Sequence, residues 1–184
     1  MTHLLSDHLP ATLSDRAVAS MHAMATGTLA DLERLTHPEA VNREAVDEPP
    51  AASEPGAAGF WATAQWLRTA FSDLDFQIHE VVEDGDLVVV HNTMSGRQTG
   101  TFVIYGADAR VEQAMPATGK AFATTQTHWL RVRDGMVIEH WANRDDQGMA
   151  MQVGWVPPTP WFLLKALVAT RRARRGEAAR RTYA

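Results

Sequence analysis

The sequence predicts an α+β fold in which helices cover one face of a curved antiparallel sheet. Apolar residues recur at helical spacing over the first 71 residues, and strand-like patterns replace this spacing from Phe76 onward. Because the helices precede the strands instead of alternating with them, the order favours α+β over a parallel α/β fold. The length of 184 residues and the 45% hydrophobic content are typical of one globular domain with a sizeable core.

Two helices are predicted in the first part of the chain. The first covers residues 13–36, with a break at Thr26-Gly27 and a stop at His37-Pro38. Residues 42–58 carry proline and glycine pairs that are typical of an irregular loop. A second helix is predicted over about 57–71, because its apolar residues recur every three or four positions: Phe60, Trp61, Ala64, Leu67, Ala70 and Phe71.

The middle of the chain is predicted as strands joined by turns. Strand patterns cover residues 76–81, 87–94, 99–105, 122–132 and 136–143. Turns are predicted at 83–86, Ser95-Gly96 and Asp134-Gly135, and a loop is predicted over 106–119. Asp134-Gly135 is the strongest hairpin signal, because glycine tolerates the positive φ that such a turn requires. A short helix is predicted from Asp146 to Val153.

A single domain is predicted over residues 1–154, and residues 155–184 form an extension. The extension starts as a proline-rich connector and continues as a basic amphipathic helix over 161–181. Residues 165–184 hold seven basic residues and one acidic residue, so they carry +6 and the remainder carries −11 of the net −5. The apolar stripe of this helix is expected to pack on the body or on a partner subunit: Trp161, Leu164, Leu167 and Val168.

The arginine-rich end of this helix has several predicted environments. It is expected to meet acidic residues such as Glu80, Glu83 or Asp84, or to remain in solvent. Contact with an anionic membrane surface is the less favoured alternative, since basic amphipathic helices also bind lipid. No nucleic-acid partner is predicted, because no aromatic residue interleaves the arginines and the body is acidic.

Composition narrows the class of protein further. No run approaches eighteen apolar residues, so no transmembrane helix is predicted. The chain has no cysteine, which excludes disulfides, thiolate metal sites and a cysteine nucleophile. The histidines lack spacings such as His-x₃-His, so no metal site is predicted. Residues 1–8 lack the features of a signal peptide, which favours a cytoplasmic location.

Candidate site residues are concentrated in the last hairpin, residues 126–146. In either register that the turn allows, His128 lies within one residue of the His140–Asn143 segment, and Gln126 shares its face. An imidazole can both accept and donate a proton near neutral pH. The alternative for His128 is a core histidine bonded to a backbone carbonyl, and His140 has the alternative of a structural role between tryptophans.

Asp145 and Asp146 stand at the junction between this hairpin and the next helix. Asp146 is predicted to cap the helix. Asp145 is expected to point into the concave side of the sheet, where burial would raise its pKa toward that of a general base. Candidate substrate contacts are Asn143, His140, Asn92, Gln126 and Trp141.

Several short motifs occur in a fixed order along the chain: Gly59-Phe60, Ala70-Phe71-Ser72-Asp73-Leu74, Gly85-Asp86, Met94-Ser95-Gly96-Arg97, Thr118-Gly119-Lys120, Arg131-Val132-Arg133-Asp134-Gly135, Ile138-Glu139-His140-Trp141, Asp145 and Met151-Gln152-Val153-Gly154. In this order they resemble the SnoaL-like polyketide cyclase or ester cyclase family of the nuclear-transport-factor-2-like superfamily, over residues 20–154. The resemblance implies a cone, in which helices back a bent sheet and a pocket opens at its mouth.

The resemblance also implies an activity. Similar proteins are cofactor-independent acid/base enzymes that close a ring of a hydrophobic, carbonyl-bearing polyketide by intramolecular aldol condensation. They use a carboxylate on the last strand, directly after a His-Trp pair, and a histidine on the preceding strand. His128 matches that histidine, whereas Ala142 stands at the carboxylate position. We therefore expect His128 and Asp145 to transfer protons.

Two alternatives to this activity remain. The first is a binding protein of the same fold, in which loss of the strand carboxylate reflects loss of catalysis. The second is an epoxide-hydrolase-like activity, with Arg144 and Asp145 positioning water. A homodimer is also predicted: if His128 faces the cavity opposite Ala142, then Trp129 and Trp141 form an aromatic patch on the other face, which a twofold partner would cover.

Overall fold

The computed structural model describes residues 12–182, so the stretch on which the signal-peptide inference rests lies outside the described residues. Its helices are α1 (Leu13–Thr26), α2 (Leu29–Leu35), the short 3₁₀ helix η1 (Pro50–Ser53), α3 (Ala57–Ala70), α4 (Asp146–Val153) and α5 (Pro160–Thr182). Its strands are β1 (Thr36–Asn42), β2 (Phe71–Asp84), β3 (Leu87–Gln98), β4 (Phe102–Tyr105), β5 (Val111–Met115), β6 (Ala121–Arg133) and β7 (Met136–Arg144).

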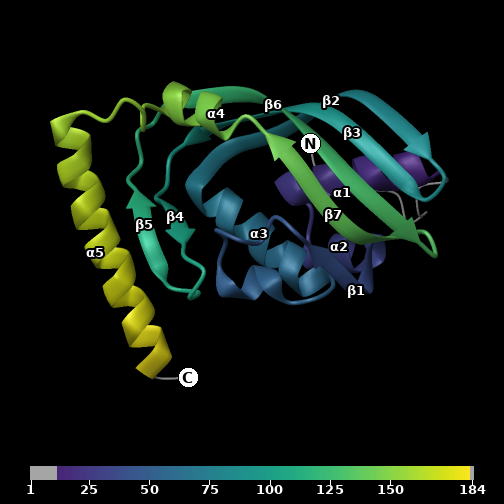
Figure 1. Cartoon of the computed structure of the whole chain (residues 1–184), viewed down its shortest axis with the longest axis horizontal. Coiled ribbons are helices and arrows are strands. Elements are labelled where there is room, and N and C mark those ends of the chain that lie inside the picture. Colours follow the sequence, from purple (N-terminus) through teal and green to yellow (C-terminus); the bar gives the residue numbers. More distant parts are fainter. Residues whose placement is uncertain (1–11, 183–184) are drawn as a thin grey trace.

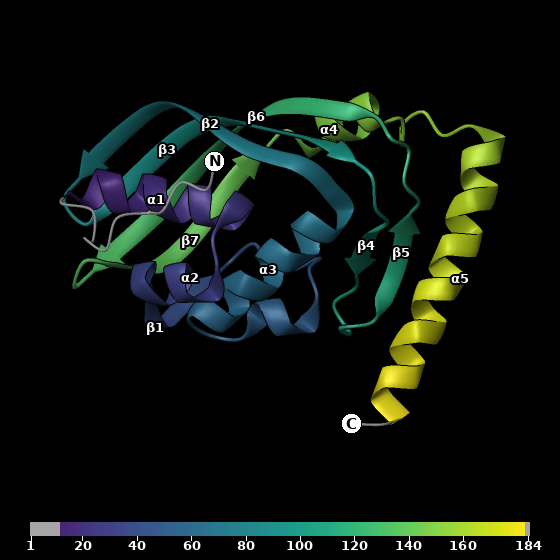
Figure 2. The same ribbon diagram turned by 180° about the vertical axis from the view of Figure 1, so that it is seen from behind.

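The predicted α+β class is confirmed. A curved five-stranded sheet with strand order β1-β7-β6-β3-β2 covers helices α1, α2 and α3, as Figure 1 shows. The sheet is antiparallel except where β1 pairs in parallel with β7. Strands β4 and β5 form a separate hairpin beside the open end of this sheet (Figure 2). The curvature leaves a concave face toward the three helices, and that face contains the candidate site.

The two N-terminal helices begin at polar capping residues. Capping boxes begin both α1 and α2, through Thr12 with Asp15 and through Thr28 with Asp31. The predicted break at Thr26-Gly27 is confirmed, since Gly27 stands directly after α1. The Arg68 guanidinium of α3 donates hydrogen bonds to three carbonyl oxygens at the end of α1, those of Ala23, Met24 and Gly27. These bonds hold α3 against α1 and fix one wall of the concave face.

The hairpin β6–β7 has a two-residue turn and, in addition, a bulge in β7. Asp134 and Gly135 both have positive φ, 51° and 74°, as a two-residue hairpin turn requires. A register shift then places Ile138 as an extra residue, so His128 lies opposite Ala142. The bulge therefore selects the register in which His128, Ala142 and His140 share the concave face.

Three predictions of secondary structure are wrong: one strand was missed, one strand was predicted as a turn, and one strand was predicted as a loop. Strand β1 was missed because it is polar and contains Pro38, and it forms only as an edge strand against β7. Ser95-Gly96 is not a turn but lies inside β3, where the Phe122 ring packs 3.2 Å from the position of a Cβ on Gly96. Strand β5 lies inside the predicted loop over 106–119, where it pairs with β4 and contacts α5.

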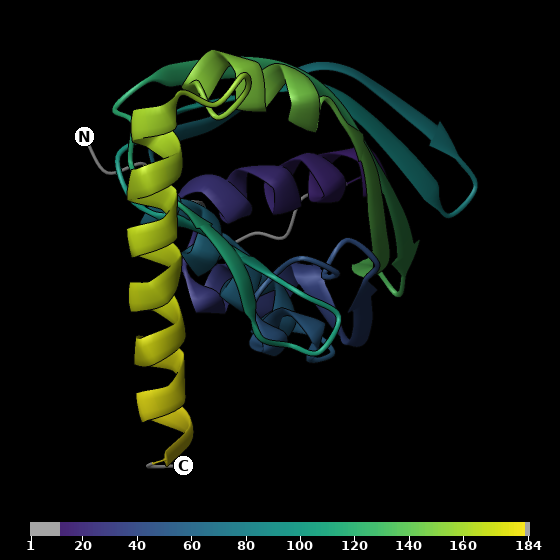
Figure 3. The same ribbon diagram turned by 60° about the vertical axis from the view of Figure 1, so that its left-hand side comes forward.

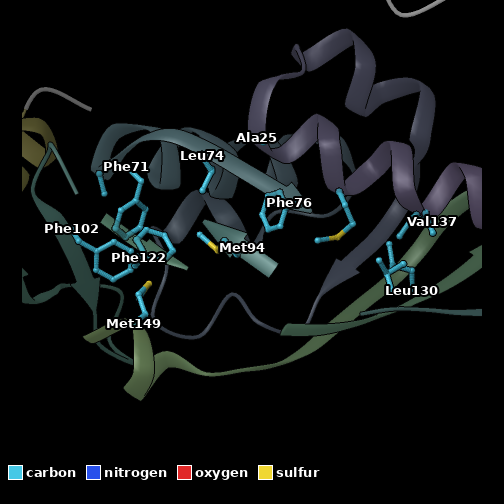
Figure 4. Packing of buried hydrophobic residues seen from close by; sticks show 14 of the residues in the cluster. Ala25, Phe71, Leu74, Phe76, Met94, Phe102, Phe122, Leu130, Val137 and Met149 are labelled. Carbon is cyan, nitrogen blue, oxygen red and sulfur yellow. The ribbon is translucent and has the colours of Figure 1, made fainter. Parts of the chain in front are cut away.

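The hydrophobic core lies between the sheet and α1 and continues toward the β4–β5 hairpin. Figure 4 shows Phe71, Phe102 and Phe122 gathered at one end, and Leu130 and Val137 at the other. The ring of Phe71 lies 5.4 Å from that of Phe102 and 5.0 Å from that of Phe122. This aromatic cluster closes the end of the sheet nearest α4, so the cavity lies further along the concave face.

Helix α5 packs beside the hairpin β4–β5 and away from the main sheet (Figure 3). Its apolar stripe does not pack on the body of this chain, since Trp161, Leu164, Leu167 and Val168 are 64%, 52%, 48% and 41% exposed, and packing on a partner subunit stays a prediction. The packed face instead contains Ala166 and Thr170, whose hydroxyl accepts a hydrogen bond from the Ala114 amide at 2.9 Å. In this orientation a polar side chain of α5 gives a hydrogen-bond partner to a backbone amide at the edge of β5. Apolar side chains cannot provide such a partner.

Among residues 12–180, the arginines at the C-terminal end of α5 do not contact Glu80, Glu83 or Asp84, the acidic partners predicted from the sequence. Arg174 donates to the carbonyl oxygens of Val111 and Glu112 at 3.0 and 2.8 Å, and Glu83 accepts hydrogen bonds from Ser14 instead. Within residues 12–182, no helix has the length and apolar character needed to cross a bilayer.

Candidate active site

A cavity lies between the concave face of the sheet and helices α1, α2 and α3. Its wall is largely apolar, and the apolar lining residues are Met21, Met24, Leu32, Phe60, Trp66, Leu67, Phe76, Met94 and Leu130. The polar lining residues are Ser20, Asn42, Glu44, Glu48, Thr63, Gln126, His128, His140 and Arg144. An apolar cavity with a few convergent polar groups is typical of a small-molecule site.

Two histidines from neighbouring strands form a hydrogen-bonded pair in this wall. The distance between His128 Nδ1 and His140 Nε2 is 2.9 Å, and the rings are stacked with centroids 5.2 Å apart. The other nitrogen of His140, Nδ1, lies 2.9 Å from Asn42 Oδ1. That oxygen also accepts a hydrogen bond from the Glu44 amide. It therefore acts as an acceptor, so His140 carries its proton on Nδ1 and accepts from His128 through Nε2.

The remaining nitrogen of His128, Nε2, faces the side-chain amide of Gln126, with 2.9 Å between Nε2 and Oε1. A protonated His128 donates to this oxygen. A neutral His128 has a lone pair there, and the pair is satisfied when the Gln126 amide turns its NH₂ group toward the ring. The Gln126 side chain therefore matches either protonation state of His128.

Burial keeps both histidines neutral near neutral pH. Burial is the main cause that lowers the pKa of His140 to about 4, and the positive charge of Arg144 adds to it. The pKa of His128 is lowered well below its usual 6.5 by burial first, and then by His140 and Arg144. The cavity therefore presents two neutral imidazoles, whose N–H groups donate to His140 and to Asn42.

A buried carboxylate, Glu48, lies in the same cavity and was not predicted from the sequence. Its side chain is 5% exposed, and its Oε2 atom accepts a hydrogen bond from the Thr63 hydroxyl. Burial raises its pKa to about 7, although the Thr63 hydrogen bond and Arg144 act in the opposite direction. Glu48 falls in a segment that reads as irregular loop, and no periodic pattern marks it as buried. The only sequence signal is its position directly before two prolines, which restrict the backbone.

The backbone around Glu48 is held from two sides. The Tyr105 amide of β4 donates to the Asp47 carbonyl at 3.0 Å. Helix α3 approaches the following residues so closely that a Cβ on Gly59 would lie 2.1 Å from the Glu54 carbonyl oxygen. The hairpin and α3 thus place the Glu48 side chain in the cavity.

The second cavity carboxylate, Glu44, contacts two polar groups of strand β7. Its Oε1 accepts a hydrogen bond from the Ala142 amide at 3.0 Å, and its Oε2 lies 3.4 Å from Arg144 Nη2. The Ala142 methyl group stands where the resemblance implies a carboxylate. In this chain the carboxylates of the cavity therefore come from the segment after β1, and not from β7.

The polar groups form one continuous chain across the cavity wall. Asn42 Nδ2 lies 3.5 Å from the Thr63 hydroxyl and joins the histidine pair to the pair of Thr63 and Glu48. In order, the chain contains Gln126, His128, His140, Asn42, Thr63 and Glu48. Within residues 12–182, no group of three or more His, Asp and Glu residues is arranged to hold a metal ion.

The expectation that Asp145 points into the cavity is wrong. Asp145 is exposed and is the N-cap of α4, where its Oδ1 accepts a hydrogen bond from the Gly148 amide at 2.7 Å. An aspartate at a helix N-terminus satisfies backbone amides that otherwise lack partners. Asp146, the predicted cap, is the first residue of the helix and lies 3.6 Å from Arg144.

Two predicted substrate contacts lie on the outer face of the sheet. The rings of Trp141 and Trp129 stack there, with centroids 6.1 Å apart and planes 6° from parallel. Asn143 accepts a hydrogen bond from the Trp129 indole at 3.3 Å. The alternation of side chains along β7 explains this placement, because His140 and Ala142 face inward and their neighbours face outward.

The remaining predicted contacts face inward. His128, His140 and Gln126 line the cavity together. Asn92 is fully buried but lies outside the cavity lining, and neither its Oδ1 nor its Nδ2 has a hydrogen-bond partner among residues 12–182. Buried polar atoms without partners are rare, so Asn92 marks a position where a polar ligand group would be favourable.

Comparisons with known proteins show the family of this chain. The sequence model of the SnoaL-like polyketide cyclase family matches residues 15–153. An aklanonic acid methyl ester cyclase of Streptomyces peucetius is 32% identical over 141 residues, covering 76% of this chain and 89% of the relative. A nogalonic acid methyl ester cyclase of Streptomyces nogalater is 28% identical over 141 residues, covering 76% of this chain and 92% of the relative.

Solved structures give the same result. TsrD from Streptomyces laurentii superposes with a TM-score of 0.61 at 27% identity, covering 76% of this chain and 92% of TsrD. IdmH from Streptomyces antibioticus superposes with a TM-score of 0.58 at 27% identity, covering 78% of this chain and 99% of IdmH. The match of the family model over most of the chain, the relative that is 32% identical and the shared fold show that this chain belongs to the SnoaL-like polyketide cyclase family.

Proposed function

We propose that this protein closes a ring of a polyketide-derived ester by intramolecular aldol condensation, with acid/base catalysis and no cofactor. The observation that carries the proposal is the neutral pair of His128 and His140, hydrogen-bonded to Gln126 and Asn42 in the wall of an apolar cavity. The named relatives are methyl ester cyclases, and this favours an ester substrate.

The cavity residues fit the steps of such a reaction. A base removes a proton from the carbon next to a carbonyl group, and the electron pair of the C–H bond forms an enolate. The enolate carbon then attacks a second carbonyl carbon, and the oxygen of that carbonyl receives a proton. Gln126 Nε2 contacts the Met94 sulfur at 3.2 Å, a weak acceptor that a substrate carbonyl would replace. The NH₂ group of Gln126 has a second hydrogen beyond the one that faces His128, so Gln126 is placed to hold the carbonyl whose oxygen becomes negative.

Asn92 extends this binding surface. Asn92 and Gln126 are directly opposite on β3 and β6, so a substrate group that reaches past Gln126 meets the unpartnered amide of Asn92. The Thr124 hydroxyl on β6 is likewise buried without a partner among residues 12–182. These atoms would accept a polar group of the substrate.

Replacing His128 with alanine is expected to lower kcat by about 10²-fold or more, because it removes the partner that orients the Gln126 amide toward the carbonyl, and loss of one such donor usually has an effect of this size. The measurement is conversion of aklanonic acid methyl ester, followed by chromatography of the product. His22→Ala is the matched control, because His22 is an exposed histidine on α1. A His128→Ala variant as active as the control would contradict the role of His128.

The same assay distinguishes the two alternatives. A binding protein would retain the ester unchanged, and its affinity would survive His128→Ala. An epoxide-hydrolase-like activity was assigned to Arg144 and Asp145, but Arg144 pairs with Glu44 and Asp145 caps α4. Since the named relatives are cyclases, the comparisons favour ring closure over both alternatives.

We also propose a homodimer formed through the outer face of the sheet, where the stacked rings of Trp129 and Trp141 are partly exposed and the Arg43 guanidinium lies 5.2 Å from the centre of the Trp141 ring. Light scattering at micromolar concentration is expected to give the mass of two chains. Trp141→Glu should give a monomer, because a buried charge opposes association. Leu29→Glu is the control and should leave the dimer intact, because Leu29 is an exposed residue of α2, on the opposite side of the sheet. A monomeric mass for the unaltered protein would contradict the proposal.

The cellular location is proposed on composition alone. The absence of cysteine is compatible with a reducing compartment, and we propose the cytoplasm. Contact of α5 with an anionic membrane surface stays the less favoured prediction for that helix.

A further inference from the structure

We propose that Glu48 is the carboxylate that removes the substrate proton in this cavity and returns it to the product. This inference rests on the proposed cyclase function and assigns its base. It places the base on the segment between β1 and α3, in place of a carboxylate on β7, where this chain has Ala142.

The contacts of the two cavity carboxylates show why Glu48 is the base and Glu44 is not. Glu44 uses one oxygen for the Ala142 amide and the other for Arg144. These partners occupy both oxygens that would receive a proton. Glu48 uses Oε2 for the Thr63 hydroxyl, and its Oε1 has no hydrogen-bond partner among residues 12–182. A free oxygen in an apolar cavity is available to a C–H group of the substrate.

The surroundings of Glu48 raise its pKa to a value that suits a general base. Burial raises its pKa to about 7; Glu44 and Asp47 act in the same direction, while Thr63 and Arg144 oppose it. A base whose pKa lies near the working pH accepts a proton readily and is still present in its charged form. An exposed glutamate is a weaker base by more than two pKa units.

The hydrogen bonds leading to Glu48 all point toward it. The Thr63 hydroxyl donates to Glu48 Oε2, so its oxygen is free to accept from Asn42 Nδ2. Asn42 Oδ1 in turn accepts from the Nδ1–H group of His140. Donors aligned in one direction polarise each other and stabilise negative charge at the end of the chain. The histidine pair therefore supports the ionised form of Glu48 without giving up a proton.

The proton balance of the step is complete within the cavity. The Glu48 carboxylate forms an O–H bond as the C–H bond breaks, and the electron pair of that bond moves into the enolate. The enolate carbon forms the new C–C bond, and the electron pair of the attacked C=O group moves to its oxygen. That oxygen takes the proton from the Glu48 carboxylic acid, so the carboxylate is restored and no co-reactant is consumed.

The test compares Glu48→Gln with Glu54→Gln, an exposed glutamate on the same segment. The probe is aklanonic acid methyl ester in D₂O, with ring closure and deuterium incorporation next to the carbonyl followed by mass spectrometry. Glu48→Gln is expected to lower kcat and deuterium incorporation by about 10²-fold, with KM changed less than about threefold. The limb of the kcat/KM profile near pH 7 should disappear in this variant and persist in Glu54→Gln.

Each outcome separates the two proposals. If Glu48→Gln keeps kcat within about threefold while His128→Ala loses it, Glu48 is not the base and the cyclase function stands. If the unaltered protein neither cyclises nor deuterates the ester, both proposals are overturned. Should Glu48→Gln fail to fold, ¹³C NMR of carboxyl-labelled glutamate in the unaltered protein decides the matter. One carboxyl should titrate near pH 7, and titration of every glutamate below about pH 5.5 would overturn the assignment.

Discussion

Replacing Gln98 with leucine should lower the free energy of unfolding by about 2–6 kcal/mol, because two buried polar groups lose their partners at 1–3 kcal/mol each. Gln98 is fully buried at the end of β3. Its Oε1 accepts from the Trp155 indole at 3.1 Å and from the Thr118 hydroxyl at 2.9 Å. Its Nε2 donates to the carbonyl oxygens of Met115 and Pro116, both at 3.2 Å. One side chain thus joins β3 to β5 and to the connector before α5.

Urea denaturation of Gln98→Leu checks this result, and Gln113→Leu is the control. Gln113 is exposed on β5, so its replacement should change stability by less than about 0.5 kcal/mol. The hairpin that Gln98 supports also contacts Asp47 through Tyr105, so Gln98→Leu is expected to lower cyclase activity as well. A loss of stability below about 1 kcal/mol would mean that leucine leaves no buried polar group unsatisfied.

The second large effect is a pH-dependent gain of stability in Glu48→Gln. The folded-state pKa of Glu48, about 7, lies above its usual 4.5, so the folded protein binds a proton that the unfolded chain releases between these values. The contribution of Glu48 to stability is therefore fully present below pH 4.5 and is lost as the pH rises through 7. Since one pKa unit corresponds to 1.36 kcal/mol, the unaltered protein should lose about 3 kcal/mol relative to Glu48→Gln.

Unfolding curves of both proteins at intervals between pH 4.5 and 8 measure this difference. The two stabilities should be similar at pH 4.5, and Glu48→Gln should be more stable by about 3 kcal/mol at pH 8. The buried histidine pair destabilises both proteins in acid, and its effect cancels in the difference. Glu54→Gln, at an exposed glutamate of the same segment, is the control. A difference for Glu48→Gln that does not change with pH would mean that Glu48 is already ionised in the folded protein.

Much of the fold follows from local patterns in the sequence. The helical spacing after residue 57 and the Asp134-Gly135 turn are independent of distant contacts, so α3 and the hairpin β6–β7 were predicted closely. The turn and the alternation of side chains then placed His128, Gln126 and His140 on one face, and all three line the cavity.

The parts that were wrong, missed or left open depend on distant contacts. Glu48 becomes buried only because β4 and α3 hold an irregular segment that has no periodic pattern of its own. Asp145 is a good candidate for either a cap or a base, and its hydrogen bond to the Gly148 amide decides for the cap. The orientation of α5 depends on the backbone groups of β5, which sequence periodicity does not reveal.

The most direct test of the cavity as the active site is a crystal structure of Glu48→Gln soaked with aklanonic acid methyl ester. This variant should bind the ester without consuming it. We expect the ester in the apolar cavity, with a carbonyl oxygen within about 3.2 Å of Gln126 and the adjacent carbon facing residue 48. An ester bound at any other surface, such as the groove along α5 that Trp161 and Arg172 line, would contradict the account.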